Sequence, residues 1–186
     1  MTAIWNNFDD GAHSLEYYAD ALTKLGAATA ASTDEISDGL EKFASIAKTV
    51  GLSYDTAAAA VATVVDKTRE SADVVGTAFK TIFGRMQGLK LGETLEDGVD
   101  LNKYSEALEA VGVEVLDAEG EVRKMDDILS DLGEKWQGFG ESTKIAIAQT
   151  VGGMRQYNQM MALMENWDAV EDNIELAKNA TGELSK

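Results

Sequence analysis

Cysteine and proline are absent from this 186-residue sequence, and histidine occurs once, as His13. Without cysteine, the chain has no disulfide framework, no thiolate zinc site and no thiol nucleophile. Without proline, a long helix meets no obligatory break, so the 17 glycines are expected to separate the helices. We interpret His13 as a surface residue, because no nucleophile-elbow motif accompanies it in the sequence.

Positive charge is also scarce, with 16 Lys and Arg residues against 33 Asp and Glu residues and a net charge of -17. Phosphate contact requires clustered basic residues, so we expect no direct nucleic-acid binding and no docking on anionic lipid. The sequence also lacks the run of about 18 uncharged apolar residues that a membrane span needs. The acidity fits either a well-solvated surface or an acidic face that meets a basic partner.

Motifs for catalysis, cofactors and metals are missing from the sequence as well. It contains no phosphate-binding glycine loop. Paired acids such as Asp126 and Asp127 fall on polar helix faces, whereas acid–base catalysis needs a carboxyl in an apolar cleft. The acidic clusters at 97–102 and 117–121 do not match the spacing of an EF-hand loop. We therefore expect that the protein is not an enzyme and has no catalytic residue, cofactor or metal site.

Apolar residues at helical spacing dominate the remaining pattern. Ser32 and Glu35 form a capping box, and the helix that follows is expected to end at Gly51. The only good strand signal is 113–123, where alternating valines flank an Asp-Ala-Glu-Gly turn. The sequence therefore predicts a mainly α fold: a helical bundle-like domain of about seven or eight helices with one small β-hairpin.

Charge and glycine positions mark the expected boundaries. Residues 91–120 carry nine acidic residues and a single basic one, which marks an exposed connector at their start. The predicted segments are an N-terminal helix and linker at 1–31, a helical subdomain at 32–91, an acidic linker at 92–102, a helical subdomain with the hairpin at 103–170, and a C-terminal tail at 171–186.

Two stripes of residues are candidates for a partner-binding or packing face. The first consists of glycines in one long helix, where each glycine costs about 1 kcal/mol relative to alanine unless a close contact offsets it: Gly76, Gly84 and Gly88. The second combines flexible methionines with a tryptophan at helical spacing, a pattern that adapts to varied partners but more often lies in a core: Met160, Met161, Met164 and Trp167.

Several sequence stretches, in a fixed order, resemble one known family. They are Thr-Asp-Glu-Ile at 33–36 followed by an alanine-rich helix, Thr-Arg-Glu-Ser-Ala at 68–72 leading into Val-Gly-Thr-Ala-Phe-Lys-Thr-Ile-Phe-Gly-Arg at 75–85, Leu-Asp-Ala-Glu-Gly-Glu-Val-Arg at 116–123, and Gly-Gly-Met-Arg-Gln-Tyr-Asn at 152–158. Together they make residues 32–167 similar to the conserved core region of phage tail tape measure proteins.

This resemblance implies a structural component of a virion. A folded module of a tape measure protein is expected to take part in tail assembly and tail length determination. Its expected partners are tail tube, tail tip or tail chaperone proteins, with self-association as a further possibility. It is expected to be made in the bacterial host cytoplasm and to reside in the phage tail. The alternative is a soluble helical protein-binding adaptor or chaperone module.

Overall fold

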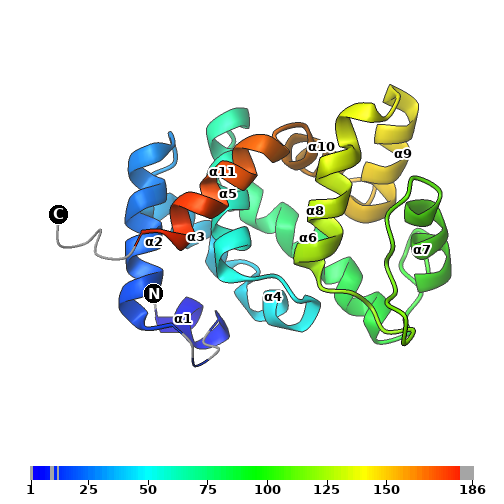
Figure 1. Ribbon diagram of the computed structural model, residues 1–186, viewed down its shortest axis with the longest axis horizontal. Coiled ribbons are helices and arrows are strands. Elements are labelled where there is room, and N and C mark those ends of the chain that lie inside the picture. Colours follow the sequence, from blue (N-terminus) through cyan, green and yellow to red (C-terminus); the bar gives the residue numbers. More distant parts are fainter. Residues whose placement is uncertain (1, 9–10, 12, 181–186) are drawn as a thin grey trace.

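The computed structural model describes residues 2–8, 11 and 13–180 (Figure 1). Across these residues there are eleven α-helices and one 3-10 helix, so the prediction of a mainly helical fold is confirmed. In chain order the elements are α1 (Thr2–Phe8), α2 (Leu15–Ala28), α3 (Thr33–Glu41), α4 (Ala44–Val50), α5 (Tyr54–Thr68), α6 (Ala72–Lys90), α7 (Leu101–Glu109), α8 (Met125–Lys135), η1 (Trp136–Gly138), α9 (Glu141–Gly152), α10 (Tyr157–Glu165) and α11 (Trp167–Lys178).

Five of the helices begin at a side chain that satisfies a free amide of the first turn. In each case, the side-chain oxygen accepts a hydrogen bond from the backbone N–H three residues later; the caps are Ser14, Ser32, Ser53, Ser71 and Asp100. At Ser32, Glu35 returns a bond to the cap amide, so the predicted capping box is present. Serine spacing in the sequence therefore sets where these helices start.

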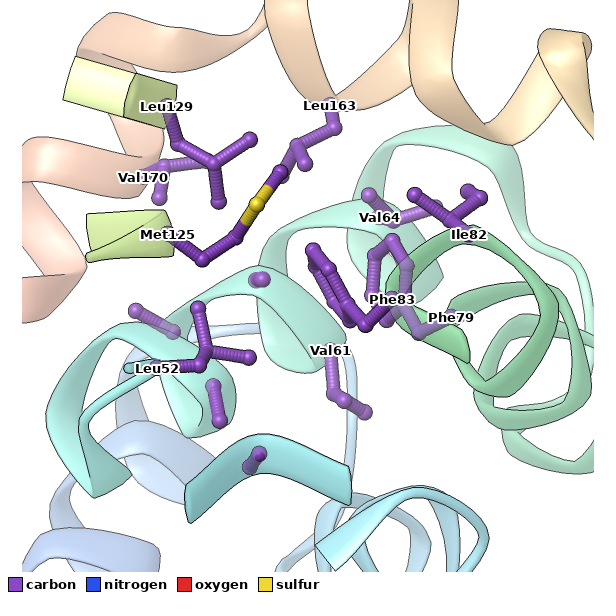
Figure 2. Packing of buried hydrophobic residues seen from close by; sticks show 14 of the residues in the cluster. Leu52, Val61, Val64, Phe79, Ile82, Phe83, Met125, Leu129, Leu163 and Val170 are labelled. Atoms are coloured by element: carbon purple, nitrogen blue, oxygen red, sulfur yellow. The ribbon is translucent and has the colours of Figure 1, made fainter. Parts of the chain in front are cut away.

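Helix α5 lies in the middle of the molecule and is buried on every side. Every residue from Thr56 to Val65 is buried, and α5 contacts α2, α3, α6, α10 and α11. The run from Ala57 to Ala60 is all alanine, which lets neighbouring helices approach closely. Around Val61 and Val64, side chains from α6, α8, α10 and α11 converge on this helix (Figure 2).

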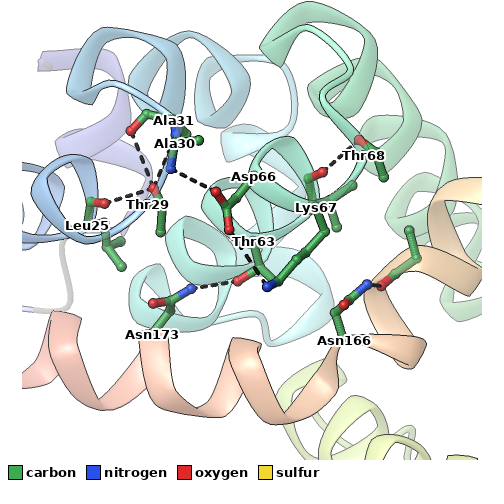
Figure 3. Close-up of polar contacts among 12 residues, drawn as sticks. Leu25, Thr29, Ala30, Ala31, Thr63, Asp66, Lys67, Thr68, Asn166 and Asn173 are labelled. Carbon is green, nitrogen blue, oxygen red and sulfur yellow. Dashed lines mark hydrogen bonds and ion pairs between the residues drawn. The ribbon is translucent and has the colours of Figure 1, made fainter.

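The polar groups that α5 buries or partly buries are matched by neighbouring elements (Figure 3). Asn173 of α11 donates from Nδ2 to the hydroxyl of the buried Thr63 at 2.8 Å. Asp66 accepts a bond from the backbone N–H of Ala30 at 2.9 Å. These contacts offset the cost of removing polar groups from water and fix α11 and the α2–α3 turn against α5.

The helix count exceeds the prediction because α1 was not predicted, the segment after Ser32 is divided, and α11 extends into the residues that were expected to form a C-terminal tail. The segment after Ser32 breaks at Phe43, a buried residue with φ -131° and ψ 8°, which separates α3 from α4. The final segment breaks at Asn166, whose side-chain amide donates to the carbonyl of Ala162 at 2.8 Å. Each break redirects the chain, so that the helix on either side can pack separately.

The predicted β-hairpin at 113–123 is wrong: no strand occurs in the described part of the chain. The segment keeps a single antiparallel bridge, between Leu116 and Val122. At its start, the N–H of Val113 bonds back to Leu108, and at its end the chain enters α8 at Met125. The chain bends at Val115, and only two backbone hydrogen bonds cross the turn, from Asp117 to Glu121 and from Arg123 to Val115, so no ladder extends beyond this bridge.

The expected linker and tail are both attached to the rest of the molecule. Residues 92–100 are irregular, but Asp97 pairs with Arg85 of α6 at 3.0 Å, and Leu95 packs against the core. Residues 171–178 belong to α11, which contacts α2 and α5, while 181–186 lie outside the described residues. One hydrophobic cluster includes residues of both predicted subdomains. No helix in the described residues is long and apolar enough to cross a membrane.

Helix α5 ends at an unusual residue. Arg69 has φ 62°, the left-handed conformation that helix ends usually assign to glycine. Its side chain is exposed. Left-handed backbone costs a non-glycine residue roughly 1–2 kcal/mol.

Replacing Arg69 by glycine should therefore raise the free energy of unfolding by about 1 kcal/mol. Urea denaturation monitored by circular dichroism measures this change. The matched control is Lys67→Gly, two residues earlier and still helical, which should lower stability by about 1 kcal/mol. A loss of stability in Arg69→Gly would show that the arginine side chain, rather than its backbone conformation, matters at this turn.

Candidate functional site

The structure places the three glycines of the predicted stripe in three different environments. Gly76 lies where α6 crosses α3: a Cβ there would stand 2.6 Å from the carbonyl oxygen of Gly39. Gly84 is half-exposed, and among the described residues only Ile46 has an atom within 4 Å of such a Cβ. Gly88 lies under the Glu93 side chain at the end of α6. Gly76 is thus an internal packing residue, and the three glycines do not form one shared face.

The methionine and tryptophan stripe lies largely inside the molecule. Met160, Met164 and Trp167 are buried, and Met161 is half-buried. The Trp167 indole packs directly on the backbone of Gly133, so closely that a Cβ on Gly133 would overlap the ring. These side chains join α8, α10 and α11, and most of their surface is occupied by contacts within this chain.

A pocket that sequence reasoning missed lies where the N-termini of α5 and α8 meet. Its volume is about 490 Å³, within the range of small-ligand sites. We call it the tyrosine–aspartate pocket; it is lined by Asn7, Phe8, His13, Tyr17, Tyr18, Lys48, Gly51, Leu52, Ser53, Tyr54, Asp55, Lys124 and Asp126. The adjacent tyrosines at 17 and 18 were its only sequence signal, because the aspartates lie 71 positions apart in the printed sequence.

Hydrogen bonds and ring contacts hold this pocket together. The Tyr17 hydroxyl donates to Asp55 at 2.6 Å, and the imidazole of His13 stacks on the Tyr17 ring at 3.9 Å. Asp126 accepts from the N–H of Ser53 at 2.9 Å, which joins α8 to the start of α5. His13 is exposed, as its interpretation as a surface residue requires, but it also covers Tyr17.

Burial dominates the electrostatics of the two carboxyls. It raises the pKa of Asp55, which the Tyr17 hydrogen bond partly counteracts. It also raises the pKa of Asp126, against the bonds from Ser53 and Thr56. The pocket therefore combines partly desolvated carboxylates with lysines at 48 and 124, an arrangement suited to a polar side chain of a partner rather than to an apolar ligand.

A second hollow, of about 750 Å³, lies between α3 and the α5–α6 turn. Five acidic residues and two basic residues contribute to its lining: Glu35, Asp38, Glu41, Lys42, Arg69, Glu70 and Asp73. Lys42 pairs with Asp73 at 2.7 Å across its rim. In the described residues, no group of three or more His, Asp or Glu side chains is placed to hold a metal ion.

A polar cluster joins η1, α9 and α10 at the end of the molecule away from the termini (Figure 1). Glu165 accepts from the Trp136 indole N–H at 2.9 Å and from Lys144 Nζ at 2.8 Å. Lys144 lies 5.9 Å above the Trp136 ring, which adds a cation–π contact. The hydrogen bond from Lys144 is the main reason that the pKa of Glu165 lies below its ordinary value of 4.5.

Comparison with known families decides the class of protein. Residues 1–153 match the family model described as phage-related minor tail protein. The chain belongs to the phage-related minor tail protein family. A structural role in the phage tail follows from this membership. The match ends before α10 and α11, which pack on α9 and α5. No solved structure matches this minor tail protein at a significant level.

Two glycine substitutions distinguish a packing role from an exposed one in this minor tail protein. Gly76→Ala should lower the free energy of unfolding by about 1–3 kcal/mol, because the added methyl meets the backbone of α3. Gly84→Ala should instead raise it by about 0.5–1 kcal/mol, because its methyl has space and alanine favours a helix. Thermal and urea denaturation measure both. Equal effects from the two substitutions would contradict the placement of Gly76 in the α3–α6 contact.

Replacing Glu165 by glutamine should destabilise the fold at neutral pH by about 1 kcal/mol, a modest value because the side chain is 37% exposed and screened by solvent. Since the folded-state pKa lies below the unfolded one, the contribution of Glu165 is present above the unfolded pKa and is lost as the pH falls through the folded pKa. Urea titrations at pH 7 and at successively lower pH should therefore show a difference in unfolding free energy that shrinks as the pH falls below 4.5. Glu171→Gln, on the exposed face of α11, serves as the control.

Proposed function

We propose that the chain is a folded module of a phage tail tape measure protein, and that it acts in tail assembly and tail length determination without catalysis. The family match over residues 1–153 carries this proposal. The tape-measure-like stretches at 33–36, 68–85 and 116–123 fall inside the matched residues, and the stretch at 152–158 lies mostly beyond them. Their ordered spacing supports the specific assignment within the broader family.

The proposed mechanism is protein–protein contact with tail tube, tail tip or tail chaperone proteins. Most of the methionine and tryptophan stripe is buried, so contact would use other surfaces of the folded module. The high acidic charge of the chain favours basic partner surfaces and opposes close approach of its own copies. In this proposal, the protein is made in the bacterial host cytoplasm and is then incorporated into the virion.

The second candidate function is that of an assembly adaptor or chaperone that leaves the particle. The tyrosine–aspartate pocket favours it, because a pocket of about 490 Å³ has room for a side chain of a single client. The two candidates differ in where the protein is found after assembly. A tape measure module remains in the tail, whereas an adaptor is released.

The test uses the phage that encodes the chain, with its coding sequence intact or deleted in frame and restored from a plasmid. Mass spectrometry of purified tails should detect peptides of this chain, and electron microscopy of the deletion should show tails that are missing or altered in length. Peptides absent from tails, with assembly still blocked, would replace the tape measure role by the adaptor role. Normal tails of normal length in the deletion would overturn both.

A further inference from the structure

Five aromatic rings line the tyrosine–aspartate pocket and contact one another. The Tyr54 ring meets Tyr18 edge to face at 4.5 Å and Phe8 at 5.4 Å between ring centroids. Tyr17 meets Tyr18 in the same way at 5.5 Å, and His13 stacks on Tyr17. Hydrogen bonds fix these rings, since the Tyr54 hydroxyl donates to the carbonyl of Tyr18 at 2.7 Å and the Tyr18 hydroxyl to that of Phe8 at 2.8 Å. The pocket therefore offers an ordered aromatic surface, and aromatic rings attract cations.

The two carboxylates beside these rings form no ion pair with the lysines of the pocket. Lys48 and Lys124 are exposed, and in the described part of the chain neither lies within ion-pair distance of Asp55 or Asp126. Burial raises the pKa of Asp55, and the charge of Asp126 raises it further, while Lys178 counteracts both in part. Two partly desolvated carboxylates that repel each other are stabilised by an added cation.

The carboxylate of Asp55 is positioned and still has an oxygen available to a ligand. Its Oδ1 accepts from the Tyr17 hydroxyl at 2.6 Å, whereas its Oδ2 accepts no hydrogen bond from the described residues and is not closed off by burial. A guanidinium presents its N–H groups as a planar fork that fits a carboxylate, and it also stacks on aromatic rings. An ammonium is a more strongly hydrated point charge. The combination of rings and carboxylates therefore favours arginine over lysine.

The charge of the whole chain indicates where such an arginine comes from. A net charge of -17 opposes the close approach of a second copy. Two of the four arginines in the sequence are also engaged within the chain, because Arg85 pairs with Asp97 at 3.0 Å and Arg123 pairs with Asp131 at 2.8 Å. A basic surface of a different protein is attracted at long range and can present an arginine to the pocket.

We propose that the tyrosine–aspartate pocket binds an arginine side chain from a basic surface of another protein, with the guanidinium hydrogen-bonded to Asp55 and stacked on the aromatic rings. A volume of about 490 Å³ has room for such a side chain. The proposal names the kind of residue that a partner supplies in the protein–protein contact, and so rests on the proposed function. Its test uses only the isolated chain, so its failure would be separate from a failure of the tail experiment.

The probe is a short capped peptide with a single arginine between serines and glycines, titrated into the full chain labelled with ¹⁵N at about 0.15 M salt, where non-specific attraction is screened. It should shift the amide resonances of residues 51–55 and 124–126 in a saturable way. The same peptide with citrulline in place of arginine keeps the shape and loses the charge, so it should bind at least about tenfold more weakly. The lysine version should also bind more weakly, because an ammonium lacks the planar fork.

Two matched variants locate the binding. Asp55→Asn should weaken binding of the arginine peptide about tenfold, because the charged acceptor is lost while Tyr17 can still donate to the amide oxygen. Asp127→Asn is the control, since this exposed aspartate lies beside Asp126 in the first turn of α8 but outside the pocket lining. Its loss should change binding less than about twofold.

Several results would overturn the proposal. They are an arginine peptide that causes no shift, equal losses of binding from the two variants, and equal binding of the citrulline or lysine peptide. Inorganic phosphate that shifts the same amides at lower concentration would assign the pocket to anions instead. Shifts that grow with protein concentration in the absence of peptide would assign the pocket to a second copy of the chain.

Discussion

Enclosure of α5 is the constraint on which the rest of the structure depends. A helix buried on all sides cannot carry charged residues, and its neighbours can approach only if its side chains are small. The alanine run from Ala57 to Ala60 satisfies both conditions. Five helices contact it, and they come from the first, middle and last parts of the chain. The arrangement of these five helices therefore depends on one short, nearly uncharged segment.

Close approach at the centre requires further close contacts around it. The α3–α6 crossing depends on two glycines, because the backbone of Gly39 meets α6 where Gly76 has no side chain. The α8–α11 contact depends on Gly133, whose missing side chain leaves room for the Trp167 ring. The helix propensity lost at each glycine is offset by the dispersion and burial gained at these crossings. Glycine in this chain therefore separates helices at some positions and joins them at others.

Local signals predicted the helices well, and long-range contacts explain what the sequence could not predict. The serine caps at Ser32, Ser53 and Ser71 act within one turn, so they are visible in the sequence and start helices in the structure. The break at Phe43 is different, because that ring is directed into a core made of distant residues. The alternating pattern at 113–123 gives a turn with one antiparallel bridge, and the bend at Val115 keeps the two sides from pairing further.

The candidate sites likewise depend on long-range contacts that the sequence does not reveal. The methionine and tryptophan stripe was recognised as a packing or partner face, yet only the fold shows that α10 packs mainly on α9 and α5 and that Trp167 packs on Gly133 of α8. The tyrosine–aspartate pocket unites Tyr17, Asp55 and Asp126 from three helices, and no spacing in the sequence encodes that meeting.

The interactions of the acidic surface differ from those of the interior. Interior helices are held together by the close fit of their side chains. A surface of one charge sign repels copies of itself and attracts basic segments at long range. The exposed acids at 114, 117, 119 and 121 belong to this surface, on a chain with a net charge of -17. Such charges keep copies of the chain apart and favour contact with a basic surface.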